Sequence, residues 1–356
     1  MAEPIHHENG ADLGPSGATD VVLEVRDVAV SFGTARGESK VVNDVSFDVY
    51  REEVLGIAGE SGSGKSMLAS SLLNVVVAPG EVSGTVTYYP SDGEPVDVVS
   101  ADRQELKQLW WEEISFAIQG AQSAFNPTMN VRTHFVETLR AHDRDVGAGL
   151  EHVRDLLSDL YLDPELVFGS YPGELSGGMK QRALIALSLL LEPNVLVMDE
   201  PTAALDLLMQ RSIVSLLQEI KTKYDLTLVF VTHDLPLVAN IADRLAVMYA
   251  FEVAEIGPTD RLLADASHPY TRALLNSVPN LKASPEDITS VGGSSPDPVD
   301  VPVGCSYHPR CPLADPKCRS ENPPFYDVDD DHVAACHHWE EARQQIPLDV
   351  VTSERS

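Results

Sequence analysis

The chain has 356 residues, of which 43% are hydrophobic, so it is long enough for two domains or for one large domain with an addition. Its formal net charge is −30 at pH 7, and its pI is about 4.5. So acidic a surface argues against nucleic-acid binding, which depends on neutralising phosphates. It suits a cytosol of very high salt, where ions screen self-repulsion, and therefore favours a halophilic source. No apolar run approaches the ~18 residues of a membrane-spanning helix.

The first elements in chain order are β-strands. Residues 1–20 are polar, without the apolar centre of a signal peptide, and we expect a disordered leader there. Apolar and polar residues alternate over 21–32 and 41–50, which predicts half-buried strands. The apolar run 54–59 predicts a buried strand.

A phosphate-binding motif follows the buried strand directly. Residues 59–66, GESGSGKS, fit G-x-x-x-x-G-K-[ST], and a helix is expected after them over 66–76. The glycines allow a tight loop whose N–H groups surround nucleotide phosphates, while the lysine reaches the β- and γ-phosphates and the last hydroxyl binds Mg²⁺. The residues predicted to bind the nucleotide are Gly59, Glu60, Ser61, Gly62, Ser63, Gly64, Lys65 and Ser66.

Two carboxylates end a later strand. Helical patterns dominate from about 103 to 190, and the next segment, NVLVMDE at 194–200, has the apolar pattern of a buried parallel strand. Asp199 is expected to hold Mg²⁺ through water, and Glu200 to orient and polarise the attacking water. Phosphoryl transfer requires this positioning and charge neutralisation more than covalent chemistry.

A second anion-binding device lies upstream of that strand. In LSGGMKQR at 175–182, a serine and two glycines open a predicted helix whose N–H groups suit an anion. With LSGG just before an Asp-Glu strand, residues 22–258 resemble the ATP-binding subunits of ABC transporters. In that family the LSGG of one subunit closes on the nucleotide held by its partner. The resemblance thus implies that Ser176, Gly177 and Gly178 contact a γ-phosphate bound to a second subunit.

The resemblance also implies roles for four further residues. Phe32 stands where an aromatic ring stacks on adenine, with a core aromatic as the alternative. Gln119 matches a glutamine that senses Mg²⁺ and faces the permease, and Asp206 matches a loop residue that helps arrange the opposite site. His233 matches the histidine that contacts the γ-phosphate and holds Glu200 and the water in place.

A few positions depart from the family pattern. Gly120 and Ala121 stand where Asp-Pro usually follows the glutamine, and Met179 replaces a glutamine often found after LSGG. Phe251 stands where a glycine turn is usual, which leaves open the shape of the hairpin expected over 244–257.

The implied fold class is α/β. It is a P-loop ATPase core with a mainly parallel sheet flanked by helices, an antiparallel β subdomain, a helical subdomain and a small cysteine-bearing C-terminal extension. The expected divisions are an ATP-binding domain at 21–258 with the helical subdomain at about 103–180, a helical segment at 259–282, a linker at 283–304, the extension at 305–345 and a tail at 346–356.

The segment after the ATPase core narrows the function. HPYTRALLNSVP at 268–279 resembles a helical segment of dipeptide, oligopeptide and nickel importers, although its apolar spacing also fits a generic amphipathic helix. The resemblance implies an ATPase that powers solute uptake from the cytoplasmic face of the membrane. Its implied partners are a second homologous ATPase, two permease subunits and an extracellular solute-binding protein. An exporter ATPase, a nonmembrane ABC ATPase and a scaffold protein are the alternatives.

All four cysteines lie near the C-terminus, with the spacing C-x5-C-x6-C-x17-C. The tight C-x2-C pairs of common zinc sites are absent, whereas Fe–S clusters commonly take four thiolates. A [4Fe–4S] cluster, which relatives of the dipeptide importers carry in this tail, is therefore predicted, with a structural or regulatory role. Zn²⁺ with substitute ligands from His308, His337 and His338 is an alternative, as are free or paired thiols. The predicted ligands are Cys305, Cys311, Cys318 and Cys336.

Overall fold

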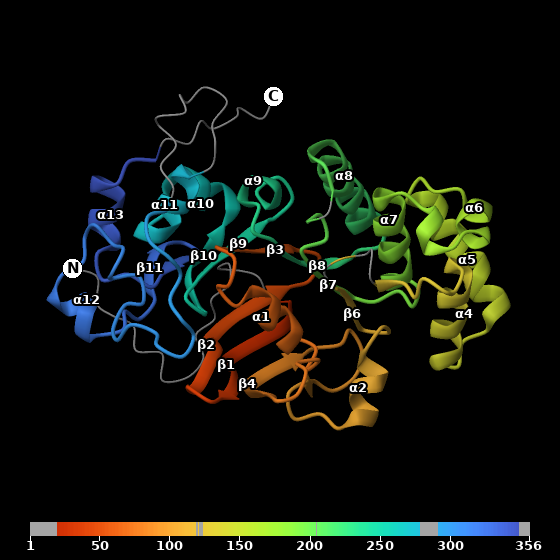
Figure 1. The fold of residues 1–356 in the computed structure, drawn as a ribbon, viewed down its shortest axis with the longest axis horizontal. Helices are drawn as coiled ribbons and strands as arrows, with labels where there is room; N and C mark the ends of the chain where they lie inside the picture. The colour runs from red at the N-terminus through yellow and green to blue at the C-terminus, as the bar shows by residue number, and fades with distance from the viewer. Residues whose placement is uncertain (1–19, 119, 121–123, 204, 278–290, 349–356) are drawn as a thin grey trace. The chain divides into compact units, whose positions relative to one another are not determined.

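The computed structural model describes residues 20–118, 120, 124–203, 205–277 and 291–348 (Figure 1). The chain forms two compact units, one made of Met1–Ala101 with Thr232–Ser356 and the other of Asp102–Val231. The leader predicted at 1–20 lies almost entirely outside the described residues, as do most of the tail and the first part of the predicted linker. No helix in the described ranges is long and apolar enough to cross a membrane.

The first unit begins with an antiparallel sheet. The strands predicted from alternation are confirmed, and each extends a few residues beyond its prediction because the two form one long hairpin. Inward residues of the first strand, including Val25, Val28 and Val30, are fully buried. In sheet order the strands are β2 (Gly37–Tyr50), β1 (Val21–Thr34), β4 (Gly80–Tyr88) and β5 (Val96–Asp97).

The same unit holds a second set of strands, which carries the phosphate loop. Its central pair is parallel and wholly buried, as expected for continuous apolar runs. The hairpin predicted over 244–257 is confirmed. Two short strands of the cysteine-bearing extension add to the sheet beside the second strand of this hairpin. The strands are β3 (Val54–Ala58), β9 (Arg244–Tyr249), β10 (Glu252–Pro258), β12 (His332–Ala334) and β11 (Tyr326–Asp329).

The helix after the phosphate loop is shorter than predicted. It ends at Ser71 instead of continuing to 76, because Asn74 takes a left-handed conformation and the N–H of Val75 donates to the carbonyl of Ser70. The helices of this unit are α1 (Lys65–Ser71), α9 (Leu235–Val238), α10 (Thr259–Asp265), α11 (Pro269–Asn276), α12 (Pro316–Ser320) and α13 (Trp339–Gln345).

The second unit is helical around three parallel strands. They pair in the order β6 (Ile114–Ala117), β7 (Val195–Asp199) and β8 (Thr227–Val231). The stretch predicted as helical is thus interrupted by β6, which is too short to show a period of its own. The helices are α2 (Arg103–Leu109), α4 (Val131–Ala141), α5 (Val146–Asp159), α6 (Pro164–Gly169), α7 (Gly177–Ser188) and α8 (Leu207–Lys223).

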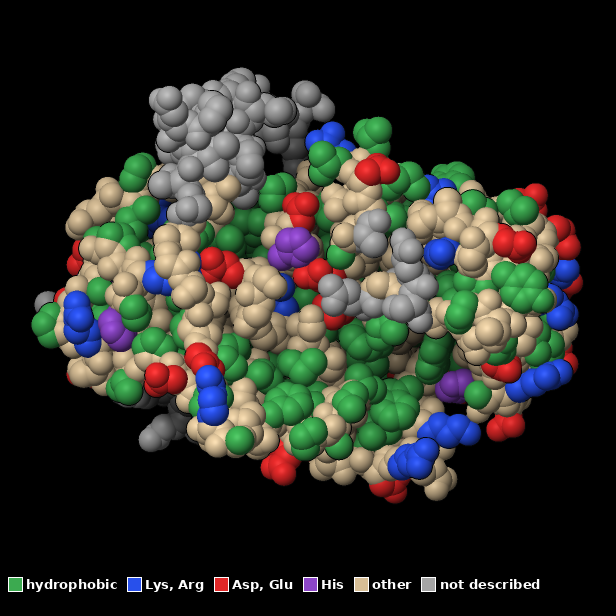
Figure 2. All heavy atoms as spheres, viewed as in Figure 1, with side chains coloured by type: hydrophobic (Ala, Val, Ile, Leu, Met, Phe, Trp, Pro, Cys, Tyr) green, Lys and Arg blue, Asp and Glu red, His purple; other side chains and the backbone are tan. Residues whose placement is uncertain are grey.

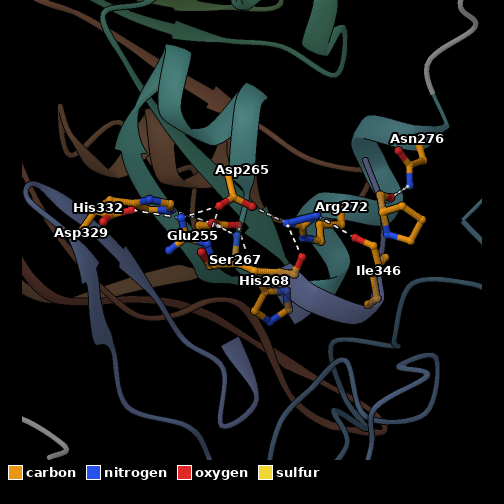
Figure 3. A network of polar contacts seen from close by, with 11 residues as sticks. Glu255, Asp265, Ser267, His268, Arg272, Asn276, Asp329, His332 and Ile346 are labelled. Carbon is orange, nitrogen blue, oxygen red and sulfur yellow. Dashed lines mark hydrogen bonds and ion pairs between the residues drawn. The ribbon is translucent and has the colours of Figure 1, made fainter. Parts of the chain in front are cut away.

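The helix predicted from HPYT is confirmed as α11, and its entry is fixed by a buried carboxylate (Figure 3). Glu255 on β10 is fully buried and accepts hydrogen bonds from the N–H groups of Ser267 and His268. The ring of His332 on β12 lies 2.7 Å from the same carboxylate. Burial lowers the pKa of His268 to about 4, so this ring is neutral at pH 7 and can accept the N–H of Tyr270 as the helix cap.

A second polar group ties α11 to the end of the described chain (Figure 3). The guanidinium of Arg272, on a side chain only 3% exposed, pairs with Asp265 and donates to the carbonyl of Ile346. Arg343 on α13 pairs with the other oxygen of Asp265. The two arginines hold the pKa of Asp265 below its usual range, although partial burial of the carboxyl opposes them. The C-terminal helix is therefore fastened to the helix that follows the ATPase core.

Candidate functional site

The phosphate loop lies between β3 and α1, in a shape that only glycine permits at two of its corners. Gly59 has φ 155° and Gly64 has φ 102°, both outside the range that side chains ordinarily adopt. A Cβ at Gly59 would lie 2.2 Å from the carbonyl oxygen of Met248, and one at Gly64 would lie 2.2 Å from that of Val41. The loop is thus packed tightly against two neighbouring backbones.

Lys65 lies at the start of α1, and its ammonium group is held inside the loop. Its side chain is buried, and Nζ donates to the carbonyls of Gly59 at 2.9 Å and Glu60 at 2.8 Å. The hydroxyl of Ser63 lies 3.4 Å from the same nitrogen. A cation held in a loop of backbone N–H groups at a helix start is suited to a phosphate chain.

The turn between β9 and β10 supports this loop from behind. Ala250 and Phe251 have φ of 48° and 75°, which is the two-residue hairpin geometry that usually selects glycine or asparagine. The Phe251 N–H donates to the carbonyl of Ser63 at 3.1 Å, and its carbonyl accepts the N–H of Asn43 at 2.8 Å. The ring of Phe251 is 3% exposed, so burial and two hydrogen bonds offset the strained backbone. The hairpin therefore makes a tight turn although phenylalanine stands where the family usually has glycine.

Two predicted nucleotide contacts lie near the loop in the same unit. Phe32 on β1 is half-buried, and a Cβ on Gly80 would lie 2.8 Å from its ring, so glycine makes room for it. His233 is exposed and follows Thr232, whose N–H donates to the carbonyl of Ile57 on β3. This bond sets the histidine beside the end of the strand that enters the phosphate loop.

The two predicted carboxylates end β7 in the second unit. Asp199 is the last residue of the strand and is 6% exposed. Glu200 has φ 45°, an uncommon conformation for a residue with a side chain, and its N–H donates to the carbonyl of Val231 at 2.9 Å. Both side chains thus stand at the carboxyl ends of parallel strands, where α/β proteins place their ligands.

The LSGG segment of the second unit caps a helix, as predicted. The hydroxyl of Ser176 accepts the N–H of Met179 at 3.3 Å at the start of α7. Because that bond uses the backbone, the departure at Met179 leaves the cap intact. Gly178 is buried, and a Cβ there would lie 2.1 Å from the methyl group of Met209. Asp206 caps α8 by accepting two N–H groups at 3.1 and 3.0 Å.

The predicted set is divided between the units. The first carries the phosphate loop, Phe32 and His233, and the second carries Asp199, Glu200, Asp206 and the LSGG residues. Gln119 lies outside the described residues.

The four cysteines converge on one small cavity in the first unit, which His268, Tyr307 and His308 also line. None of them forms a disulfide. Burial raises the pKa of the Cys311 thiol to about 11 and also raises the pKa of the Cys305 thiol. Both shifts favour the protonated thiol at neutral pH. The backbone N–H of His338 donates to Cys336 Sγ at 3.3 Å.

Side chains beside Cys318 lie close enough to share a metal ion. In the described part of the chain, the only group of three ligand atoms within 4.8 Å of one another is Asp315, Cys318 and His338. That group combines the sulfur, nitrogen and oxygen donors that zinc sites use.

Comparisons with known proteins agree with this geometry. A family model described as ABC transporter matches residues 42–203, and one described as the C-terminal region of oligopeptide/dipeptide transporters matches 254–318. The dipeptide transport ATP-binding protein DppD of Caldanaerobacter subterraneus is 38% identical, over 91% of this chain and 98% of its own. The oligopeptide transport ATP-binding protein OppD of Escherichia coli is 37% identical, over 89% of this chain and 93% of its own.

The chain belongs to the ATP-binding proteins of oligopeptide and dipeptide ABC transporters. The fold of this ABC ATPase is similar to that of the dimeric ATP-binding cassette MJ0796 bound to ADP and Pi, with a TM-score of 0.57 and 23% identity. That match covers 67% of this chain and 98% of the cassette. The predicted α/β P-loop fold class is thereby confirmed.

Proposed function

We propose that the chain hydrolyses ATP to power the uptake of peptides, or of a related small solute, through a membrane ABC importer. The observation that carries the proposal is similarity along nearly the whole chain to ATP-binding proteins named for dipeptide and oligopeptide transport. The match over 254–318 to the C-terminal region of such transporters favours an importer over an exporter ATPase or a nonmembrane ABC ATPase.

The nucleotide would be bound by the residues that the sequence motifs predict. Residues 59–66 hold the phosphates and Phe32 stacks on the adenine. Mg²⁺ is held by Ser66, Asp199 and Gln119. Lys65 neutralises phosphate charge, while Glu200 and His233 orient the attacking water, each acting through positioning and electrostatics.

The site would be completed by a partner. Ser176, Gly177 and Gly178 of this chain close on the nucleotide of a second, homologous ATPase, and Asp206 helps arrange that opposite site. Two permease subunits hold the pair at the cytoplasmic face of the membrane, and an extracellular solute-binding protein delivers the cargo. The acidic charge of the chain supports a role without nucleic acid.

The cysteine group would hold a [4Fe–4S] cluster, with Cys305, Cys311, Cys318 and Cys336 as ligands. The support is the convergence of the four cysteines on one cavity, two of them buried, and the N–H donor at Cys336 Sγ. The bound cluster supplies a rigid centre for a tail with little core of its own. ATP hydrolysis transfers no electrons, so the cluster is structural or regulatory.

The acidic surface would be an adaptation to a very salty cytosol. On the face shown in Figure 2, acidic side chains are spread among polar and apolar ones instead of forming one patch. Such a distribution fits general hydration of the surface rather than a single cation-binding partner.

The proposal is tested by purifying the chain with the proteins that bind it and identifying the ligand of any associated solute-binding protein. Co-purification of permeases, with peptide uptake into proteoliposomes that requires internal ATP, is the expected result. Isolation with ribosomes or DNA instead of permeases would contradict it.

A further inference from the structure

The geometry points to Arg310, in the cysteine-bearing extension, as a positioning residue for the phosphate loop: it neutralises and fixes Glu60 so that the loop can accept a polyphosphate. This inference rests on the proposed binding of ATP by residues 59–66. It adds a residue that lies outside every motif of the ATPase core, next to the predicted ligand Cys311.

Arg310 and Glu60 form a two-pronged ion pair. Nη1 of the guanidinium lies 2.8 Å from Oε2 of the carboxylate, and Nη2 lies 3.0 Å from Oε1. The arginine side chain is 7% exposed and the glutamate side chain 24% exposed, so water screens the pair only partly. Parallel bonds of this kind fix orientation as well as charge.

The remaining donors and the plane of the guanidinium are also occupied. Nε donates to the carbonyl of Gly292 at 2.6 Å, and Nη2 donates to that of Val291 at 3.1 Å. The guanidinium carbon lies 5.4 Å from the ring centre of Tyr249 and 5.8 Å from that of Tyr307. Arg310 is therefore held from several sides and does not behave as a mobile surface cation.

Glu60 is held at its backbone as well. Its N–H donates to the hydroxyl of Tyr270 on α11 at 2.9 Å, and its carbonyl accepts Nζ of Lys65 at 2.8 Å. Tyr270 is fully buried, with its ring centre 4.5 Å from that of Tyr249. Residues of the C-terminal region thus contact Glu60, the second residue of the phosphate loop, at its side chain and at its backbone N–H.

The negative charge of Glu60 explains why its contact with Arg310 should affect ATP binding. A carboxylate within a loop that binds a polyphosphate repels the ligand unless a cation neutralises it. Arg310 supplies that cation. Removing it leaves the Glu60 charge uncompensated and the loop less well fixed, so nucleotide affinity should fall. If the charge of Glu60 is removed first, loss of Arg310 should matter much less.

The test is a double-mutant cycle on the full-length chain, with Mg·ATP affinity measured by equilibrium binding of ATP. Arg310→Met keeps the apolar stem, and we expect it to raise the Kd about five- to tenfold. In a Glu60→Gln background the same change should raise the Kd less than about twofold. Arg310→Lys keeps the charge but cannot form the two parallel hydrogen bonds, so its Kd should lie between those of the unchanged chain and Arg310→Met. Turnover at saturating ATP should change less than KM, because the reacting groups remain.

Matched controls separate this role from folding and from the proposed site. Arg319→Met removes an exposed arginine that adjoins another predicted ligand, and it should leave the Kd unchanged. Iron and zinc content and circular dichroism are measured for each variant. An equal effect of Arg310→Met in both backgrounds, or no effect in either, would overturn the inference. ATP binding that survives Lys65→Ala would overturn the proposed phosphate site itself, and the inference with it.

Discussion

Glu200 stands at a strand end in a left-handed backbone conformation, with its N–H bonded to the neighbouring strand. Glu200→Gln keeps the shape and removes the charge that orients water. We expect the ATP turnover number of the assembled complex to fall about 10²–10³-fold, while ATP still binds. Phosphate release measures the first effect, and accumulation of an ATP-bound dimer on size exclusion measures the second. Normal turnover would contradict the assigned role.

Gly64 is required in the phosphate loop because a side chain would not fit there, and not because it takes part in the reaction. Gly64→Ala would place a methyl group 2.2 Å from the Val41 carbonyl at a φ of 102°, so loop or strand must shift. We expect ATP affinity to fall about tenfold or more and the melting temperature to drop, because such strain costs roughly 1–3 kcal/mol. Gly173→Ala, with no atom within 4 Å of the new methyl, is the control. Equal behaviour of the two variants would show that the loop is not tightly packed.

At the scale of elements, the fastening of α11 to α13 can be broken by one substitution. Arg272→Met removes a buried cation that pairs with Asp265 and bonds the Ile346 carbonyl. We expect the free energy of unfolding to fall by about 2–4 kcal/mol, since breaking a buried pair leaves its partners unsatisfied. Urea unfolding measures it. Arg343→Met, at a more exposed side chain, should cost less, and the reverse order would refute this reading of the network.

The length of an element decided whether the sequence could predict it. The long alternating runs predicted β1 and β2, and the family resemblance and apolar spacing of HPYTRALLNSVP predicted α11. By contrast, β6, β11 and β12 have three or four residues each, too few for a period to show. They form because a neighbouring strand offers a row of hydrogen-bonding groups. The end of α1 depended on the backbone conformation of Asn74, which its residue type only favours.

The candidate site divides in the same way. The phosphate loop, the carboxylate pair and the LSGG segment are contiguous in sequence, so local spacing predicted them. The groups that support the loop come from far along the chain: Phe251 holds the Ser63 carbonyl, and Arg310 holds Glu60. The sequence around each of these two residues does not predict such a contact. The two residues of each contact are some 190 or 250 positions apart in the sequence, and only the folded sheet brings them together.

At the scale of the whole molecule, the net charge of −30 predicts that the stability of the chain depends on salt. Raising KCl from 0.1 to 1 M shortens the screening length from about 10 to 3 Å and so weakens self-repulsion. We expect the melting temperature to rise steeply with KCl and structure to be lost on dialysis into dilute buffer. An equimolar series of NaCl should act alike, whereas isosmotic sucrose should not reproduce the full effect. Stable folding in dilute buffer would contradict a halophilic adaptation.

The pairing of β12 with β10 has a consequence for solubility. Ala334 and Val333 cover one side of Glu255 and Ile256, so the extension occupies what would otherwise be an open sheet edge. A chain that ends before Cys305 would present a bare row of N–H and C=O groups flanked by the apolar side chains of β10, a template for pairing between molecules. Light scattering should detect self-association of that truncation, whereas the full-length chain should stay monodisperse. We therefore expect the cysteine-bearing extension to protect the edge of β10 from pairing between molecules, in addition to any role of its cysteines.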